Sequence, residues 1–101
     1  MGIDLQWISE RGEVRERVLD PRNLMSEIVA GAKEESVCLR FIDPYGDAVF
    51  NQLQIPVLIE EIRSVAVDVL SREAVEHRDE VVALAAKAKG QVHTYLKFFG
   101  D

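Results

Sequence analysis

The chain has 101 residues, of which 48% are hydrophobic and 30% are charged, a composition typical of one packed globular domain spanning residues 1–101. Apolar residues run along the whole chain and exclude a disordered protein, and a single cysteine excludes an internal disulfide, so we expect a cytoplasmic protein. The longest uncharged stretch, Ala48 to Ile59, contains polar residues and is too short to span a bilayer, so no membrane partner is expected.

The formal net charge is −6, and it is unevenly distributed. The segment from Asp43 to Glu80 contains nine acidic and three basic residues, which accounts for the whole excess. A field of this sign repels nucleic acid and favours a basic protein partner. The alternative is that these acids only keep two helices soluble.

The N-terminal part of the chain predicts two strands and a helix. Ile3, Leu5 and Trp7 alternate with polar residues, which is the pattern of a half-buried strand over residues 3–8. A turn at Gly12 and a second strand over residues 13–19 follow. Asp20 can then cap a helix that begins at Pro21 and carries apolar residues at helical spacing, namely Leu24, Met25, Ile28, Val29 and Ala32.

Residues 36–50 predict a β-hairpin. The alternation over Ser36–Ile42 predicts a strand with Leu39 and Phe41 at the centre of the core. The segment Asp43–Asp47 has the composition of a tight turn, in which Gly46 would supply a positive φ. Residues 48–50 then return as the partner strand.

The C-terminal half predicts two helices and a last strand. Pro56 opens a helix whose apolar face comprises Leu58, Ile59, Ile62, Val65, Ala66 and Val69. Ser71 can cap a third helix that ends before Gly90. Residues 92–99 alternate like a strand, with the alternative that the third helix continues through Gly90. The predicted order is ββαββααβ, an α+β fold with a small antiparallel sheet and helices packed on one face.

No pattern in the sequence predicts an enzyme, a cofactor or a metal site. The chain has no glycine-rich phosphate loop and no nucleophile motif. Cys38 and His93 form the one conceivable thiol–imidazole pair, but Cys38 lies in an apolar segment and is expected to be a buried small hydrophobe. His77 and His93 are too far apart in the sequence for a short metal-ligand motif.

Small size, missing catalytic motifs and the acidic segment favour a non-enzymatic protein-interaction domain, such as an acidic inhibitor or immunity-type partner of a basic protein. Tyr45, between Asp43 and Asp47 at the tip of the predicted turn, is the candidate recognition residue, unless its ring folds back over the hairpin. The polar sides of the second and third helices add a set of candidate acids, which are Glu60, Glu61, Asp68, Glu76, Asp79 and Glu80.

Two further expectations concern a small-molecule site and the formation of a homodimer. The alternative function is a small-molecule-binding or catalytic domain that uses the Asp43–Asp47 turn together with Glu60 and Glu61. A homodimer through residues 92–99 is also expected, because a terminal strand that is apolar on both faces needs to be covered.

Overall fold

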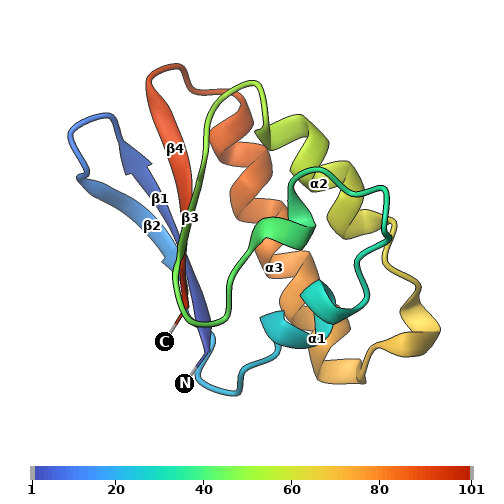
Figure 1. Cartoon of the computed structure of the whole chain (residues 1–101). Helices are drawn as coiled ribbons and strands as arrows, with labels where there is room; N and C mark the ends of the chain where they lie inside the picture. The colour runs from blue at the N-terminus through green and yellow to red at the C-terminus, as the bar shows by residue number, and fades with distance from the viewer. Residues whose placement is uncertain (1, 101) are drawn as a thin grey trace.

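The computed structural model describes residues 2–100 and shows a four-stranded sheet with a layer of helices on one side (Figure 1). Two short 3-10 helices, η1 and η2, lie in the connections. In chain order the elements are β1 (Ile3–Ser9), β2 (Val14–Val18), α1 (Met25–Ala30), η1 (Leu39–Phe41), β3 (Asp47–Phe50), α2 (Ile55–Arg63), η2 (Val67–Val69), α3 (Arg72–Lys89) and β4 (Thr94–Gly100). Within residues 2–100, no helix has the length and apolar character needed to cross a membrane.

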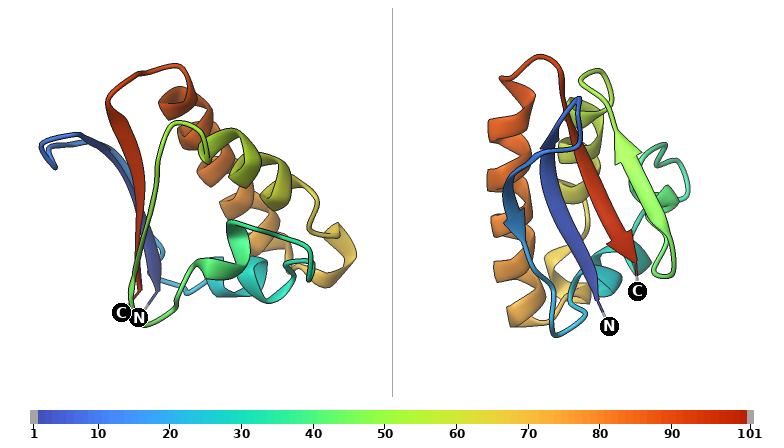
Figure 2. Two further views of the ribbon diagram at one scale, coloured as in Figure 1. Left: turned by 45° about the horizontal axis from the view of Figure 1, so that its top comes forward. Right: turned by 90° about the vertical axis from the view of Figure 1, so that its left-hand side faces the viewer.

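The sheet is antiparallel with the strand order β2-β1-β4-β3. The C-terminal strand β4 pairs with β1 along its whole length, from Gly100 opposite Ile3 to Thr94 opposite Ser9, and with β3 on its other side. The two edges of the sheet are therefore β2 and β3 (Figure 2, right). The α+β class, the antiparallel sheet and the placement of the helices on one face are confirmed.

The face of the sheet that meets the helices carries the core. Leu5 and Trp7 in β1 and Leu96 and Phe98 in β4 are buried, and they alternate with partly exposed residues, as period-2 patterning requires. Phe50 in β3 meets Phe98 edge to face, with ring centroids 5.9 Å apart. The helices add a further set of fully buried side chains, which includes Met25, Ile28, Ile55, Leu58, Ile62 and Val81. Among residues 2–100, no helix lies over the opposite face of the sheet (Figure 2, left).

The first helix begins later than the sequence predicts. Asp20 does bind the free amides of the helix start, since its carboxylate accepts hydrogen bonds from Leu24 at 2.6 Å and from Met25 at 3.0 Å. However, Asn23 has a φ of 56°, a left-handed conformation that interrupts helical geometry, and α1 begins only at Met25. The prediction of Pro21 as the first helical residue is wrong for this reason.

The predicted strand over Ser36–Ile42 is wrong. The carboxylate of Glu61 in α2 accepts the backbone amides of Val37, Cys38 and Leu39 at 2.6, 2.9 and 2.9 Å. Because these amides converge on one side chain, they cannot alternate in direction as a strand requires, and the chain turns into η1. Leu39 is buried as predicted, whereas Phe41 is 59% exposed and lies outside the core.

The turn before β3 also differs in detail. The Asp43 carboxylate accepts the amide of Tyr45 at 2.8 Å, which closes an Asx-type turn, but Gly46 does not have the expected positive φ. A Cβ at Gly46 would lie 2.8 Å from Oδ2 of Asp43, the end of a flexible side chain, so a side chain at position 46 would require Asp43 to shift. The positive φ belongs instead to Gly12, at 85°, in the β1–β2 turn.

The C-terminal half follows the prediction with one correction. Ser71 caps α3 by accepting the amide of Ala74 at 3.1 Å, and residues 94–100 form a strand, so α3 does not continue through Gly90. Helix α2 ends at Arg63, earlier than predicted. The backbone is extended at Ala66, so Ala66 does not continue α2, and Val69 lies in the separate 3-10 helix η2. Since β4 is paired on both sides, it has no free edge of the kind expected of a terminal strand, and the dimer through residues 92–99 stays a prediction based on the apolar faces of the strand.

Candidate functional site

The six candidate acids on the helices do not behave as one group. Glu61 is engaged with the backbone of residues 37–39, and Glu60 and Asp79 lie 4.0 Å from Arg63 and Arg78, respectively. The remaining three acids are exposed and make no ion pair within the described part of the chain, residues 2–100; they are Asp68 in η2 and Glu76 and Glu80 in α3. Of the six acids, Glu61 is held by the backbone, whereas Glu60 and Asp79 make long contacts at the surface.

Glu61 is a structural anchor for the loop that precedes β3. Burial by itself would raise the pKa of Glu61, but the three backbone amides of Leu39, Val37 and Cys38, together with the charge of Arg40, outweigh that effect and hold the pKa below its usual range. The ionised carboxylate is therefore the form that the fold stabilises. Sequence reasoning missed this role because the anchored amides lie more than twenty residues away.

The predicted turn site lies at the start of β3. Tyr45 is 81% exposed, so the alternative in which its ring folds back over the strands is wrong. Asp47, the first residue of β3, has an oxygen 3.7 Å from Nζ of Lys97, and the same ammonium group lies over the ring of Phe99, 4.4 Å from its centroid. The carboxylate of Asp43 is used by its own turn. The structure therefore places Tyr45 in solvent beside an edge strand.

The hydrogen-bond phase of β3 identifies which of its backbone groups face outward. Gly100 donates its amide to the carbonyl of Gly46, so the bonded positions of the β3–β4 ladder fall at every second residue from Gly46. Asp47 and Val49 then point their amides and carbonyls away from β4. Within residues 2–100, no backbone or side-chain group binds these four polar groups. Val49 itself is 51% exposed.

The other edge of the sheet is blunted. The middle of β2 consists of Arg15, Glu16 and Arg17, and the pairing of β2 with β1 is interrupted by a bulge between Trp7 and Ile8. Charged residues and bulges are features by which natural sheets discourage pairing with other chains. The edge strand β3 has four residues, of which only Asp47 is charged, and its pairing with β4 shows no register shift.

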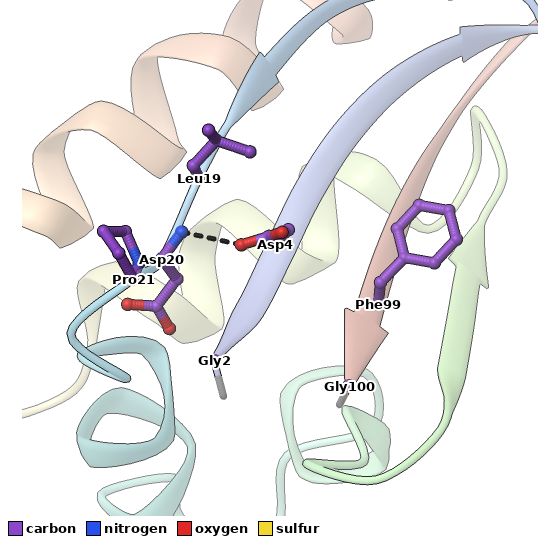
Figure 3. A pocket seen from close by; sticks show the side chains of 7 residues that line it. All are labelled: Gly2, Asp4, Leu19, Asp20, Pro21, Phe99 and Gly100. Carbon is purple, nitrogen blue, oxygen red and sulfur yellow. Dashed lines mark hydrogen bonds between the residues drawn. The ribbon is translucent and has the colours of Figure 1, made fainter.

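One hollow lies on the surface at the end of the sheet where β1 begins and β4 ends. This hollow of about 350 Å³ is lined by seven residues, namely Gly2, Asp4, Leu19, Asp20, Pro21, Phe99 and Gly100 (Figure 3). The side chain of Asp4 lies between Leu19 and Phe99, and its carboxylate accepts the amide of Asp20 at 2.7 Å. Two lining residues, Gly2 and Gly100, adjoin in sequence the residues that the structure does not describe, so the hollow does not define a site.

Metal and thiol chemistry have little support from the geometry. No three His, Cys, Asp or Glu side chains among residues 2–100 come together in a way that could hold a metal ion. Cys38 is buried, and burial, together with the charge of Glu61, raises the pKa of its thiol, which disfavours the nucleophilic thiolate.

Comparison with known proteins adds no functional assignment, since no protein-family model, curated protein or solved structure matches the chain.

Proposed function

We propose that the chain is a protein-interaction domain that accepts an extended segment of a partner protein along the free edge of β3. The observation that carries this proposal is the set of outward backbone groups of Asp47 and Val49, which have no partner within residues 2–100. An extended segment that adds to a sheet edge gains its affinity from such groups and its specificity from the side chains nearby. Here those side chains are Tyr45 and Val49, which are both exposed.

The helix acids give less support to a docking surface than β3 does. Glu61 is bound to the backbone, and Glu60 and Asp79 each lie 4.0 Å from an arginine at the surface, so that only Asp68, Glu76 and Glu80 are without a nearby cation in the described region. In this proposal, the acidic helices keep the domain dispersed, and the turn at Tyr45 with β3 carries recognition. The cytoplasmic location and the exclusion of nucleic acid stay predictions from composition.

Site-specific photocrosslinking in cells tests the proposal. A photoreactive phenylalanine analogue in place of Val49 should give a discrete adduct on irradiation, because its side chain borders the docked segment. The matched control places the same analogue at Arg17 on the β2 edge, where we expect no adduct. The absence of an adduct from position 49, or equal adducts from both positions, would overturn the proposal, and the adduct mass identifies the partner.

A further inference from the structure

We propose that the segment docked on the β3 edge is β3 of a second copy of this chain, paired antiparallel about a two-fold axis at Ala48. The inference rests on the proposed function and names its occupant. It arises from the self-complementarity of the edge and from the charges on the two edges of the sheet.

The backbone fixes the register of such a pair. In an antiparallel ladder, residues with outward amides and carbonyls bond to residues of the same kind on the other strand. An axis at Ala48 sets Asp47 opposite Val49 of the second copy, and Val49 opposite Asp47 of that copy, so that all the outward groups of β3 are paired. An axis at Val49 would instead set Asp47 opposite Asn51, whose amide already binds Oε1 of Gln54 at 2.9 Å. The Ala48 axis is therefore the register that satisfies the edge.

The side chains are compatible with this register. Residues at the centre of the pair approach closely, with Cα atoms about 4.5 Å apart, and Ala48 is small enough for that distance. Asp47 faces Val49 of the other copy rather than another acid, and each Asp47 keeps Lys97 beside it. The same register directs the turn of Tyr45 toward residues 51–53 of the second copy, where Leu53 is 85% exposed. In this pairing the exposed side chains of Tyr45 and of Leu53 in the second copy lie in the same region of the interface.

The β2 edge could not form the corresponding pair. An axis at Arg15, Glu16 or Arg17 places a charged residue opposite its own copy, and like charges directly opposite each other destabilise a sheet. This contrast between the edges makes β3 the edge through which two copies associate.

The salt dependence of binding distinguishes self-association from the binding of a basic partner. Each copy carries a net charge of −6, so two copies repel each other over long distances. Added salt screens that repulsion and should strengthen self-association, whereas it would weaken the binding of a basic protein.

Two substitutions at one position give a matched test by light scattering and analytical ultracentrifugation. Val49→Glu places acids opposite Asp47 at both ends of the pair and should weaken the dimer roughly 2- to 30-fold. Val49→Lys places an opposite charge at the same points and should leave the dimer as strong as the wild type or make it stronger. Equal effects of the two substitutions, or a wild-type chain that stays monomeric at every concentration and salt level, would overturn the inference.

A disulfide tests the register itself. In a Cys38→Ala background, Ala48→Cys should form a covalent dimer under mild oxidation, because Cα atoms about 4.5 Å apart lie within disulfide range. The control, Arg17→Cys in the same background, should stay monomeric. Equal cross-linking of the two variants would overturn the Ala48 axis, and circular dichroism verifies that each variant is folded. If photocrosslinking at position 49 yields an adduct with a different protein while the wild type is monomeric, this inference fails and the proposed function stands.

Discussion

Ile3, at the start of β1, donates its backbone amide to the carboxylate of Asp20 at 3.1 Å, across 17 residues of sequence. The same buried carboxylate accepts hydrogen bonds from the amides of Leu24 and Met25. Its Oδ1 lies 3.9 Å from Nε2 of the buried His77 in α3. One side chain thus joins the first strand to the start of the first helix, and it lies beside the long helix at one end of the sheet.

Removal of the Asp20 carboxylate should therefore destabilise the whole domain. We expect Asp20→Ala to lower the free energy of unfolding by about 2–4 kcal/mol, because it leaves buried backbone amides without an acceptor. Chemical denaturation measures this value, with the exposed Asp68→Ala as a control that should change it by less than about 0.5 kcal/mol. A loss below about 1 kcal/mol for Asp20→Ala would show that the amides find other partners.

The neighbouring acids Glu60 and Glu61 should differ sharply in their contribution to stability. Glu61→Ala removes the acceptor of three amides and should cost about 1–3 kcal/mol, whereas Glu60→Ala removes one long contact at the surface and should cost less than about 0.5 kcal/mol. Denaturation curves of the two variants provide the comparison. Equal costs would mean that the loop at residues 37–39 does not depend on the carboxylate.

Glu61 also makes stability depend on pH in a defined direction. Its pKa in the folded chain lies below the ordinary value of 4.5, so the folded state favours the ionised form. The resulting stabilisation is fully present above pH 4.5 and is lost as the pH falls through the lowered pKa. The difference in unfolding free energy between the wild type and Glu61→Gln should shrink over that acidic range. A difference that stays constant from neutral pH to pH 3 would contradict this assignment.

Truncation of Leu39 should cost much more stability than truncation of Phe41. Leu39 is fully buried, so Leu39→Ala should cost about 2–5 kcal/mol through lost burial and a cavity. Phe41 is largely exposed and stacks against Arg40, so Phe41→Ala should cost less than about 1 kcal/mol. A cost for Phe41→Ala as large as that for Leu39→Ala in denaturation experiments would indicate that residues 36–42 form the strand that their alternation suggests.

Local signals explain which parts of the fold could be predicted from the sequence. Alternation in Ile3–Ser9 and Thr94–Gly100 and the Ser71 cap depend on neighbouring residues, and the structure confirms these elements. The strand prediction for residues 36–42 is wrong because the backbone of this segment is held by Glu61, which lies far along the chain. Its alternation was coincidental: Cys38 and Leu39 are adjacent and both buried, which no strand with one covered face allows.

Only part of the candidate site could be predicted from the sequence, because the rest depends on contacts between distant segments. Tyr45, Asp43 and Asp47 were selected from the turn chemistry alone, and Tyr45 is indeed exposed. The edge formed by β3 could not be foreseen, because it exists only when β4 enters the sheet between β1 and β3. A hairpin with residues 36–42 would have covered the edge that the structure leaves free.

Hydrogen exchange at Val49 tests the central claim most directly, since the amide of Val49 points out of the sheet and that of Ala48 points toward β4. If β3 is the docking edge for a second copy, exchange at Val49 should be fast in dilute solution and slow several-fold as the protein concentration rises. Exchange at Ala48 should stay slow throughout, which provides an internal control. Exchange at Val49 that stays equally fast at every concentration would contradict the account.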